Sequence, residues 1–305
     1  MSRFVIFRIS SLLFTLFVAV SVVFFAMRLA PGDPAQLLAG QQTQEDVKRV
    51  REFLGLNMPI HVQYIRFLTG VIRGDLGVSA LTKGSVSKEI LRTMPATFVL
   101  LTMSMLLTTG IGVPAGVICA LASGSIYDLL IMLLVVGALS VPNFWLGILM
   151  IDLFSVRLGW LPTSGFWGIK STIMPALAIA ARQIAIVTRM TRVSMLEVLG
   201  EDYIKVACAK GLPNGAIVIK HGLRNALLPV VTTLGLQTGF LLGGSIVIEV
   251  LFAWPGIGQL LINAITTRDY NLIQGITVFY VGGFLLTTFF MDLCYAWLDP
   301  RIRYG

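Results

Sequence analysis

The sequence TMPATFVLLTMSMLLTTGIGVPAGVICALASGSIY, residues 93–127, decides the class of fold because it contains no Asp, Glu, Lys or Arg. It exceeds the roughly 20 apolar residues that a helix needs to cross the hydrocarbon core of a bilayer. A β-barrel would instead show alternating hydrophobicity over segments of about 10 residues. Four more uncharged stretches lie between Arg8 and Arg28, Asp128 and Asp152, Arg224 and Glu249, and Asp269 and Asp292. The sequence therefore predicts an all-α polytopic membrane protein.

The composition of the 305-residue chain agrees with this class. Hydrophobic residues make up 56% and charged residues only 12%, whereas about a quarter of an ordinary soluble domain is charged. Disordered, fibrous and ordinary globular proteins are thereby excluded. The formal net charge of +8 does not indicate a nucleic-acid partner, because the basic residues lie beside the apolar stretches, where membrane orientation accounts for them.

Six transmembrane helices are expected, at residues 9–27, 96–122, 128–152, 173–189, 227–249 and 272–298. The first apolar run is longer than that of a usual secretory signal, so we interpret it as a retained span. Pro142 is expected to kink the third span. In the second span, Gly110, Gly112 and Gly116 either let a neighbouring helix approach closely or loosen the helix, and close packing is the commoner reason.

The region between the first two spans, residues 29–94, is predicted to be a small extracytoplasmic helical region. Thr43 and Asp46 have the spacing of a capping box, and Gly55 stands where the helix that they open would end. A second amphipathic helix follows, and Gly74 begins the break after it. Both glycines are thus expected to punctuate helices.

A third short helix is expected at 86–91, separate from the second span that follows Pro95. This places the start of the membrane core just after that segment. The chain is accordingly divided into an N-terminal transmembrane helix at 1–28, the extracytoplasmic region at 29–94 and a five-helix membrane core at 95–305 that includes an inner segment at 191–225.

Lys and Arg residues near the spans predict the orientation of the chain. With the N-terminus inside, basic residues are numerous on the inner side and few in the short outer loops, as the positive-inside rule requires. Residues 29–94 do not overturn this orientation, because stretches beyond about 60 residues translocate largely regardless of charge. We therefore expect both termini in the cytoplasm. The inner residues are Arg3, Arg8, Arg189, Arg192, Lys205, Lys210, Lys220, Arg224, Arg301 and Arg303, together with Arg182 if it lies outside the bilayer, and the outer ones are Arg157, Lys170 and Arg268.

Motifs of enzymes are missing from the sequence. It has no G-x-x-x-x-G-K-[ST] phosphate loop, no H-E-x-x-H and no G-x-S-x-G. Cys119, Cys208 and Cys294 lack the paired spacing of a metal, redox or disulfide site. We therefore expect no catalytic residue, no metal site and no nucleotide site in this chain.

The inner segment 191–225 is too long and too basic to be a simple connector. Residues 201–210 fit a short helix that Gly211 and Pro213 end. Ala207 and Ala209 keep this helix narrow, as docking into a groove of a partner would require. A basic amphipathic segment lying on anionic lipid explains the pattern equally well.

Short motifs spread over nearly the whole chain carry a resemblance to a known family. They are PGDPA (31–35), LGL (54–56), QY (63–64), GDLG (74–77), VPNFW (141–145), LGWLP (158–162), EDY (201–203), AKG (209–211), HGLRNA (221–226), GGS (243–245), FAWPG (252–256), RDY (268–270) and DPR (299–301). In this order and spacing, the sequence resembles the permease subunits of bacterial ATP-binding-cassette (ABC) importers of the peptide/nickel class, which includes dipeptide, oligopeptide and glutathione permeases.

The resemblance implies a type I ABC importer permease fold in the bacterial inner membrane and inward transport of a small peptide or peptide-like solute by alternating access. The implied partners are a second similar permease, two ATPase subunits that bind ATP and Mg²⁺, and an extracytoplasmic solute-binding protein. No cofactor is expected in this chain. The residues expected to couple it to the ATPase are Glu201, Asp202, Tyr203, Ala207, Ala209, Lys210 and Gly211.

Charged and polar residues within the predicted spans are candidates for the translocation path. An uncompensated charge at the bilayer centre costs about 2.5–3.5 kcal/mol on insertion scales, so Arg182 in the fourth span should face a partner or a wet cavity. Asp152, near the outer end of the third span, is the expected partner, and a substrate-facing or a structural arginine both stay open. Asn143 and Gln237 complete the candidate path.

Other functions stay open beside peptide import. The same family includes importers of nickel, opines and sugars. A self-sufficient secondary transporter would show an inverted repeat and ion-binding residues at broken helices, and we find no such repeat. A membrane-embedded enzyme would need a cluster of catalytic groups that the sequence lacks.

Overall fold

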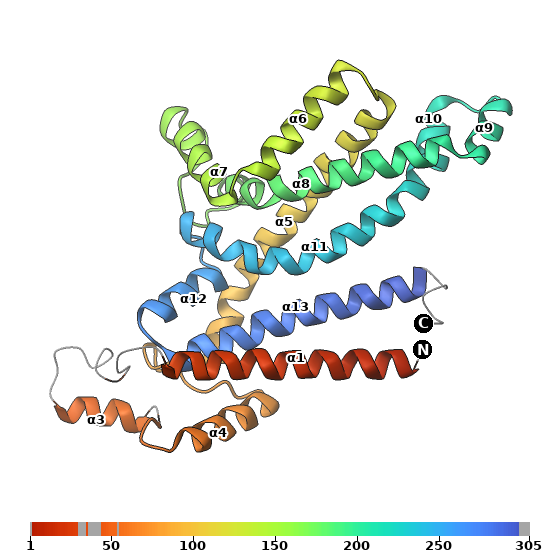
Figure 1. The fold of residues 1–305 in the computed structure, drawn as a ribbon. Coiled ribbons are helices and arrows are strands. Elements are labelled where there is room, and N and C mark those ends of the chain that lie inside the picture. Colours follow the sequence, from red (N-terminus) through yellow and green to blue (C-terminus); the bar gives the residue numbers. More distant parts are fainter. Residues whose placement is uncertain (1, 30–34, 36–43, 54, 299–305) are drawn as a thin grey trace. The chain divides into compact units, whose positions relative to one another are not determined.

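The computed structural model describes residues 2–29, 35, 44–53 and 55–298, and their regular structure is almost entirely helical (Figure 1). One isolated β-bridge joins Val78 and Ser85. Thr43 of the predicted capping box and the motifs at 31–34 and 299–301 lie outside these residues. The helices are α1 (Ser2–Leu29), α3 (Gln44–Phe53), α4 (Ile60–Arg73), α5 (Val86–Leu121), α6 (Ile126–Ser140), α7 (Asn143–Met150), α8 (Ile169–Gly200), α9 (Asp202–Ala209), α10 (Asn214–Ala216), α11 (Arg224–Leu251), α12 (Ile257–Thr266) and α13 (Tyr270–Leu298), with π-helical turns η1 (Ile151–Arg157) and η2 (Ile217–Leu223).

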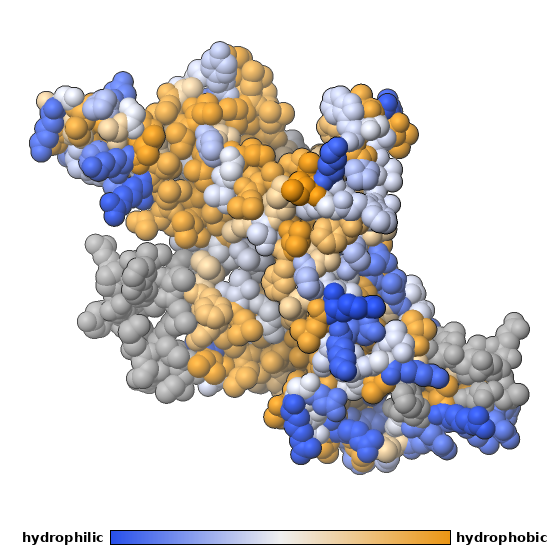
Figure 2. Space-filling view, turned by 180° about the vertical axis from the view of Figure 1, so that it is seen from behind, coloured by the Kyte–Doolittle hydropathy of each residue, from blue (hydrophilic) through white to orange (hydrophobic). Residues whose placement is uncertain are grey.

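The apolar helices agree with the six predicted spans. Four helical stretches are long and apolar enough to cross a bilayer alone: Phe7–Leu29, Val86–Leu121, Ile169–Gly200 and Tyr270–Met291. Two bent pairs supply the others when each pair is counted as one span: Ile126–Ser140 with Asn143–Arg157, and Asn214–Gly239 with Leu241–Leu251. Figure 2 shows a broad hydrophobic surface, as lipid-facing helices require. Phe14, Leu134 and Val156 are among the exposed apolar side chains of the transmembrane helices.

Three details of the prediction were wrong. The segment at 86–91 is not a separate helix, because α5 begins at Val86 and continues through Pro95. A proline removes one hydrogen bond from a helix, but Val86 and Ile90 are buried in an apolar cluster that holds the first turns of α5 in place. The fourth span does not end at 189, since α8 continues to Gly200 and its buried Met195 packs in a second cluster. The apolar helix α12 was not predicted.

The chain divides into two compact units. Unit 1 comprises residues 1–97 and 255–289, and unit 2 comprises residues 98–254 and 290–305. Helices α5 and α13 each contribute to both units along their length. The predicted division at residues 28 and 94, which follows membrane topology and not compactness, stays a prediction.

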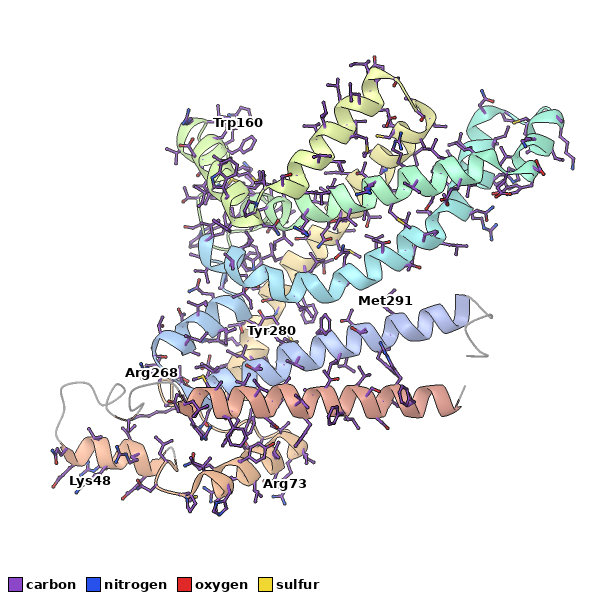
Figure 3. The ribbon with its side chains drawn as sticks, viewed as in Figure 1. Lys48, Arg73, Trp160, Arg268, Tyr280 and Met291 are labelled. Carbon is purple, nitrogen blue, oxygen red and sulfur yellow. The ribbon has the colours of Figure 1, made fainter. Side chains whose placement is uncertain are left out.

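Unit 1 is built around an apolar cluster and a buried carboxylate. Ile257 and Ile276, both fully buried, pack with the start of α5. Asp269, also fully buried, lies beside the Arg268 labelled in Figure 3. Its Oδ1 accepts a hydrogen bond from the Leu272 N–H at 3.2 Å, and its Oδ2 accepts one from the Ser79 Oγ at 2.6 Å. One carboxylate thus caps α13 and anchors the loop that precedes α5.

One of the two helices of the predicted extracytoplasmic region, α4, attaches to α1 within unit 1. The Arg28 side chain donates from Nε and from a terminal nitrogen to Gln63 Oε1 of α4, at 3.1 and 2.9 Å. Phe24 stacks with Phe67, with ring centroids 5.6 Å apart. Helices α3 and α4 end where predicted, because Gly55 and Gly74 have φ of 66° and 74°, the left-handed region that glycine occupies without strain.

Unit 2 is organised around α8, which packs against α6, α7 and α11. It also packs closely on α5: a Cβ added at Gly112 would lie 3.0 Å from the Val187 side chain, and one added at Gly116 would lie 2.6 Å from the Thr188 carbonyl oxygen. Of the two explanations for these glycines, the structure therefore supports close packing. Gly110 has nothing within 4 Å of an added Cβ, so it does not take part.

Candidate functional site

The third predicted span is broken, and the break creates an open helix N-terminus. Pro142 lacks an N–H and disfavours helical geometry at the residue before it, and Val141 is indeed extended, with φ −96° and ψ 127°. Helices α6 and α7 meet there at 107°, far more than the predicted kink. Helix α7 starts at Asn143, and among the described residues no side chain caps it. Its first N–H groups therefore keep a partial positive charge.

A cavity of about 330 Å³ lies within unit 2, at the place where α7, α8 and α11 come together (Figure 1). Its walls follow the helical period, with positions three and four residues apart on α8 and on α11. The site is thus made by one face of each long helix and by the start of α7. Its lining residues are Asn143, Ile179, Arg182, Gln183, Ile186, Gln237, Leu241 and Gly244.

Two neighbouring side chains of α8 have unused hydrogen-bonding capacity in this cavity. Within the described part of the chain, the Arg182 guanidinium forms no ion pair and no hydrogen bond, and its side chain is exposed. Gln183 is only 7% exposed, and its Oε1 atom is buried without a hydrogen-bond donor among the described residues. The cavity therefore offers several cationic donors and one buried acceptor.

The predicted partnership between Arg182 and Asp152 was wrong. The Asp152 carboxylate pairs instead with Arg157, five residues further along the same π-helical segment, with Oδ2 and Nε 2.8 Å apart. Asp152 is not among the residues that line the cavity. Three of the four predicted path residues, Arg182, Asn143 and Gln237, do meet there. Gln183 was missed, although a polar residue in an apolar span was a signal for it.

The second candidate site is α9, the short helix of the inner segment. It ends at Ala209, and the chain turns away at Gly211, whose φ is 72°. The Gly211 N–H donates to the Cys208 carbonyl at 3.0 Å, and the Leu212 N–H donates to the Ala207 carbonyl at 3.4 Å. These two bonds form a Schellman motif, in which the glycine terminates the helix. The predicted helix end is thus confirmed.

Helix α9 is braced from one side by the residues that follow it. Ile204 and Ala207 are buried against Ile217 of η2. The Tyr203 Oη accepts a hydrogen bond from Asn225 Nδ2 at 2.8 Å, which joins the EDY and HGLRNA motifs. Ala207 therefore faces the chain's own interior, and its small size serves internal packing. The other predicted coupling residues, Glu201, Asp202, Tyr203, Ala209, Lys210 and Gly211, are exposed.

Two family models match the sequence and together span most of it. The model described as "Binding-protein-dependent transport system inner membrane component" matches residues 112–304. The model described as "Binding-prot-dependent transport system membrane comp, N-term" matches residues 1–102. The boundary between the two falls within α5.

Relatives of known name match along their whole length. The glutathione transport system permease protein GsiC of Pectobacterium atrosepticum is 44% identical over 306 residues, which cover 100% of both chains. The protein of the same name from Escherichia coli K12 is 42% identical, again over 306 residues and 100% of both chains.

Solved structures of transporters share the fold. The inward-facing MetNI methionine ABC transporter matches with a TM-score of 0.55 and 21% identity, over 69% of this chain and 96% of that chain. An amino acid ABC transporter matches with a TM-score of 0.52 and 16% identity, over 68% and 92%. These likenesses establish the type I importer permease fold that was predicted. From the family models and the full-length relatives together, we conclude that this chain belongs to the binding-protein-dependent transport system inner membrane components, as a peptide-class ABC importer permease.

Proposed function

We propose that this chain forms one half of the translocation path of an importer for a peptide-like solute, with glutathione as the first candidate. The observation that carries the proposal is the identity of 42–44%, over the full length, to permeases named for glutathione transport. In the working importer, a second permease completes the path, two ATPase subunits bind ATP and Mg²⁺, and an extracytoplasmic solute-binding protein delivers the solute. Both termini of this chain lie in the cytoplasm.

The cavity of α7, α8 and α11 supports a path through unit 2. It collects Asn143, Arg182, Gln183 and Gln237 from three helices whose residues are mainly apolar. Polar side chains inside a membrane protein are costly and face either a partner or a solvated route. Because the chain supplies no charged partner for Arg182 among its described residues, a solvated route accounts best for this set.

The exposed side of α9 is our candidate for the ATPase contact. Ile204 and Ala207 brace the helix from within, so its outward side chains are held in fixed positions. Val206, 53% exposed, is an apolar residue at the centre of that side. An apolar side chain ringed by polar ones is typical of a protein interface.

The proposal is tested by uptake of radiolabelled glutathione into proteoliposomes that contain the complete complex and the loaded solute-binding protein. We expect uptake to require ATP in the lumen of the proteoliposomes, on the side of the ATPase subunits. Uptake should cease when ATP is replaced by a non-hydrolysable analogue. Uptake that ignores ATP and follows an ion gradient would identify a secondary transporter instead. Failure to carry glutathione or any small peptide would contradict the peptide-like substrate.

Coupling is tested with Val206→Asp, which places a carboxylate at the proposed contact. Burying an unpaired charge in an interface is expected to weaken ATPase binding by roughly tenfold or more. The matched control is Ile219→Asp, because Ile219 is an equally apolar, 67% exposed residue of the same inner segment outside α9. Co-purification of the ATPase with each variant gives the readout. Equal retention of the ATPase by both variants would rule out α9 as the contact.

A further inference from the structure

The cavity of unit 2 holds hydrogen-bonding groups of both kinds that no described part of the chain uses. Arg182 contributes a guanidinium with five N–H donors, and it pairs with no described carboxylate. Gln183 contributes a buried carbonyl oxygen that accepts no hydrogen bond. Both residues line the same space. Buried polar groups in proteins are nearly always satisfied, so the unsatisfied Gln183 Oε1 indicates a missing donor. The exposed Arg182 guanidinium, which has no protein partner among the described residues, is free to bind the same ligand.

The start of α7 adds a third set of hydrogen-bonding groups without a partner among the described residues, the N–H donors of its first turn. Asn143 lines the cavity, and it is the first residue of a helix that no described side chain caps. The N–H groups of a first helical turn favour an anion. The Arg182 guanidinium and the N-terminus of α7 therefore both favour binding of an anion, and both would repel a metal cation.

The acceptor on Gln183 narrows the choice of anion. A free halide has no N–H to donate to the Oε1 atom, and neither does a simple carboxylate such as acetate. The last residue of a peptide carries a planar carboxylate and, two bonds away, an amide N–H. A guanidinium binds a planar carboxylate through two parallel hydrogen bonds. A cavity of about 330 Å³ accommodates such a terminal residue.

We propose that this cavity is a recognition site for the C-terminal carboxylate and the adjoining amide N–H of the transported solute. The Arg182 guanidinium and the N-terminus of α7 bind the carboxylate, and the Gln183 Oε1 accepts the amide N–H. The inference rests on the proposed function, since it assigns the solute a free C-terminal end. It also goes beyond the similarity to glutathione permeases, because it requires this chain itself to recognise the carboxylate and the amide N–H of the solute.

The test compares uptake of glutathione with uptake of its C-terminal amide, γ-glutamyl-cysteinyl-glycinamide, at saturating loaded binding protein. The ratio of the two maximal rates is measured for the natural chain and for Arg182→Met, with the same binding protein, so that the binding protein's own preference cancels. We expect the preference for the carboxylate to fall roughly tenfold in the variant, as when one charge-assisted hydrogen bond is lost. Arg189→Met, seven residues along the same helix and outside the cavity lining, is the control and should keep the original ratio.

A second comparison examines the acceptor. Gln183→Leu removes the Oε1 atom, so it should abolish discrimination between glutathione and an analogue that ends in N-methylglycine and lacks the amide N–H. If Arg182→Met does not assemble, Arg182→Lys keeps the charge but not the planar fork, and it should lower the carboxylate preference only in part. Unchanged ratios in the Arg182 and Gln183 variants would overturn the site while leaving glutathione uptake, and thus the proposed function, intact.

Discussion

At the scale of single residues, the pair Asp128 and Arg192 shows how a buried charge is accommodated at the edge of a membrane span. The Asp128 side chain is only 8% exposed, and its two oxygens each accept a hydrogen bond of 2.7 Å from the Arg192 guanidinium. The Gly124 N–H adds a bond of 3.1 Å to Oδ2. The turn between α5 and α6 has no basic residue of its own, so α8 supplies the compensating charge from 64 residues away.

We expect a double-mutant cycle on this pair to reveal strong coupling. Arg192→Met strands the buried Asp128 carboxylate, which should cost about 3–5 kcal/mol of unfolding free energy. Asp128→Asn leaves the partly buried Arg192 without its partner and should cost somewhat less. The double variant should regain much of that loss. The pair Asp152 and Arg157, 48% and 70% exposed, serves as the control. Its cycle should give less than about 1 kcal/mol. Unfolding in mixed detergent micelles provides the measurement, and equal coupling in the two pairs would contradict the argument.

The candidate site could be predicted from sequence only where a residue stands out against its own neighbours. Arg182, Asn143 and Gln237 are polar residues in apolar runs, and the structure brings all three to one cavity. Gln183 became a candidate only through its missing partner, which is a property of the folded chain. The expected partner of Arg182 was wrong because Arg157 reaches Asp152 within the same segment. Which residues form an ion pair depends on how close their side chains come in the folded chain. The predicted bounds of the spans do not contain that information.

At the scale of elements, helix ends were predictable and helix packing was not. Gly55, Gly74 and Gly211 end their helices through bonds within a few residues, so the signal is local. The continuation of α5 through Pro95 depends on a cluster that includes residues from α12 and α13, more than 150 residues later. No local pattern contains that information. The same holds for the 107° turn between α6 and α7, where the sequence predicted only a kink.

The close packing of α5 on α8 gives a prediction for glycine substitutions. A methyl group at Gly116 would lie 2.6 Å from the backbone oxygen of Thr188, so Gly116→Ala should force the helices apart and cost about 1–3 kcal/mol. Gly110→Ala on the same helix meets no atom within 4 Å. It should be neutral or stabilising by up to about 1 kcal/mol, because alanine favours helix more than glycine. The yield of monodisperse protein after heating separates the two variants. An equal loss of monodisperse protein in the two variants would mean that the glycines make the helix flexible and do not serve close packing.

At the scale of the whole molecule, the number of spans follows from sequence because it depends on the length of apolar runs, five of them uncharged and the fourth span interrupted by Arg182. Each run is matched by one apolar helix or one bent pair of helices. The orientation rests on a different property, the unequal distribution of Lys and Arg between the two sides. An even number of spans would place both termini on one side, and the positive-inside rule predicts that this side is the cytoplasm. The exposed Trp160 and Trp167, 65% and 82% exposed, follow the third span in a short loop (Figure 3 labels Trp160), as interfacial aromatics do.

Cysteine labelling in intact cells tests this orientation directly. The chain is first freed of Cys119, Cys208 and Cys294, and single cysteines are then introduced at Lys83 or Asn214, both exposed residues outside the spans predicted from the sequence. Lys83 lies between the first and second spans, and Asn214 lies in the inner segment between the fourth and fifth. A maleimide that cannot cross the membrane should modify Lys83→Cys in whole cells and Asn214→Cys only after the cells are opened. Permeabilised cells, in which both positions must react, control for reactivity. One orientation of the chain fixes the sides of both loops. Modification of Asn214→Cys in whole cells together with protection of Lys83→Cys would therefore show that the topology is the reverse of the predicted one. Helix α9 would then lie outside the cell, where it could not meet an ATPase.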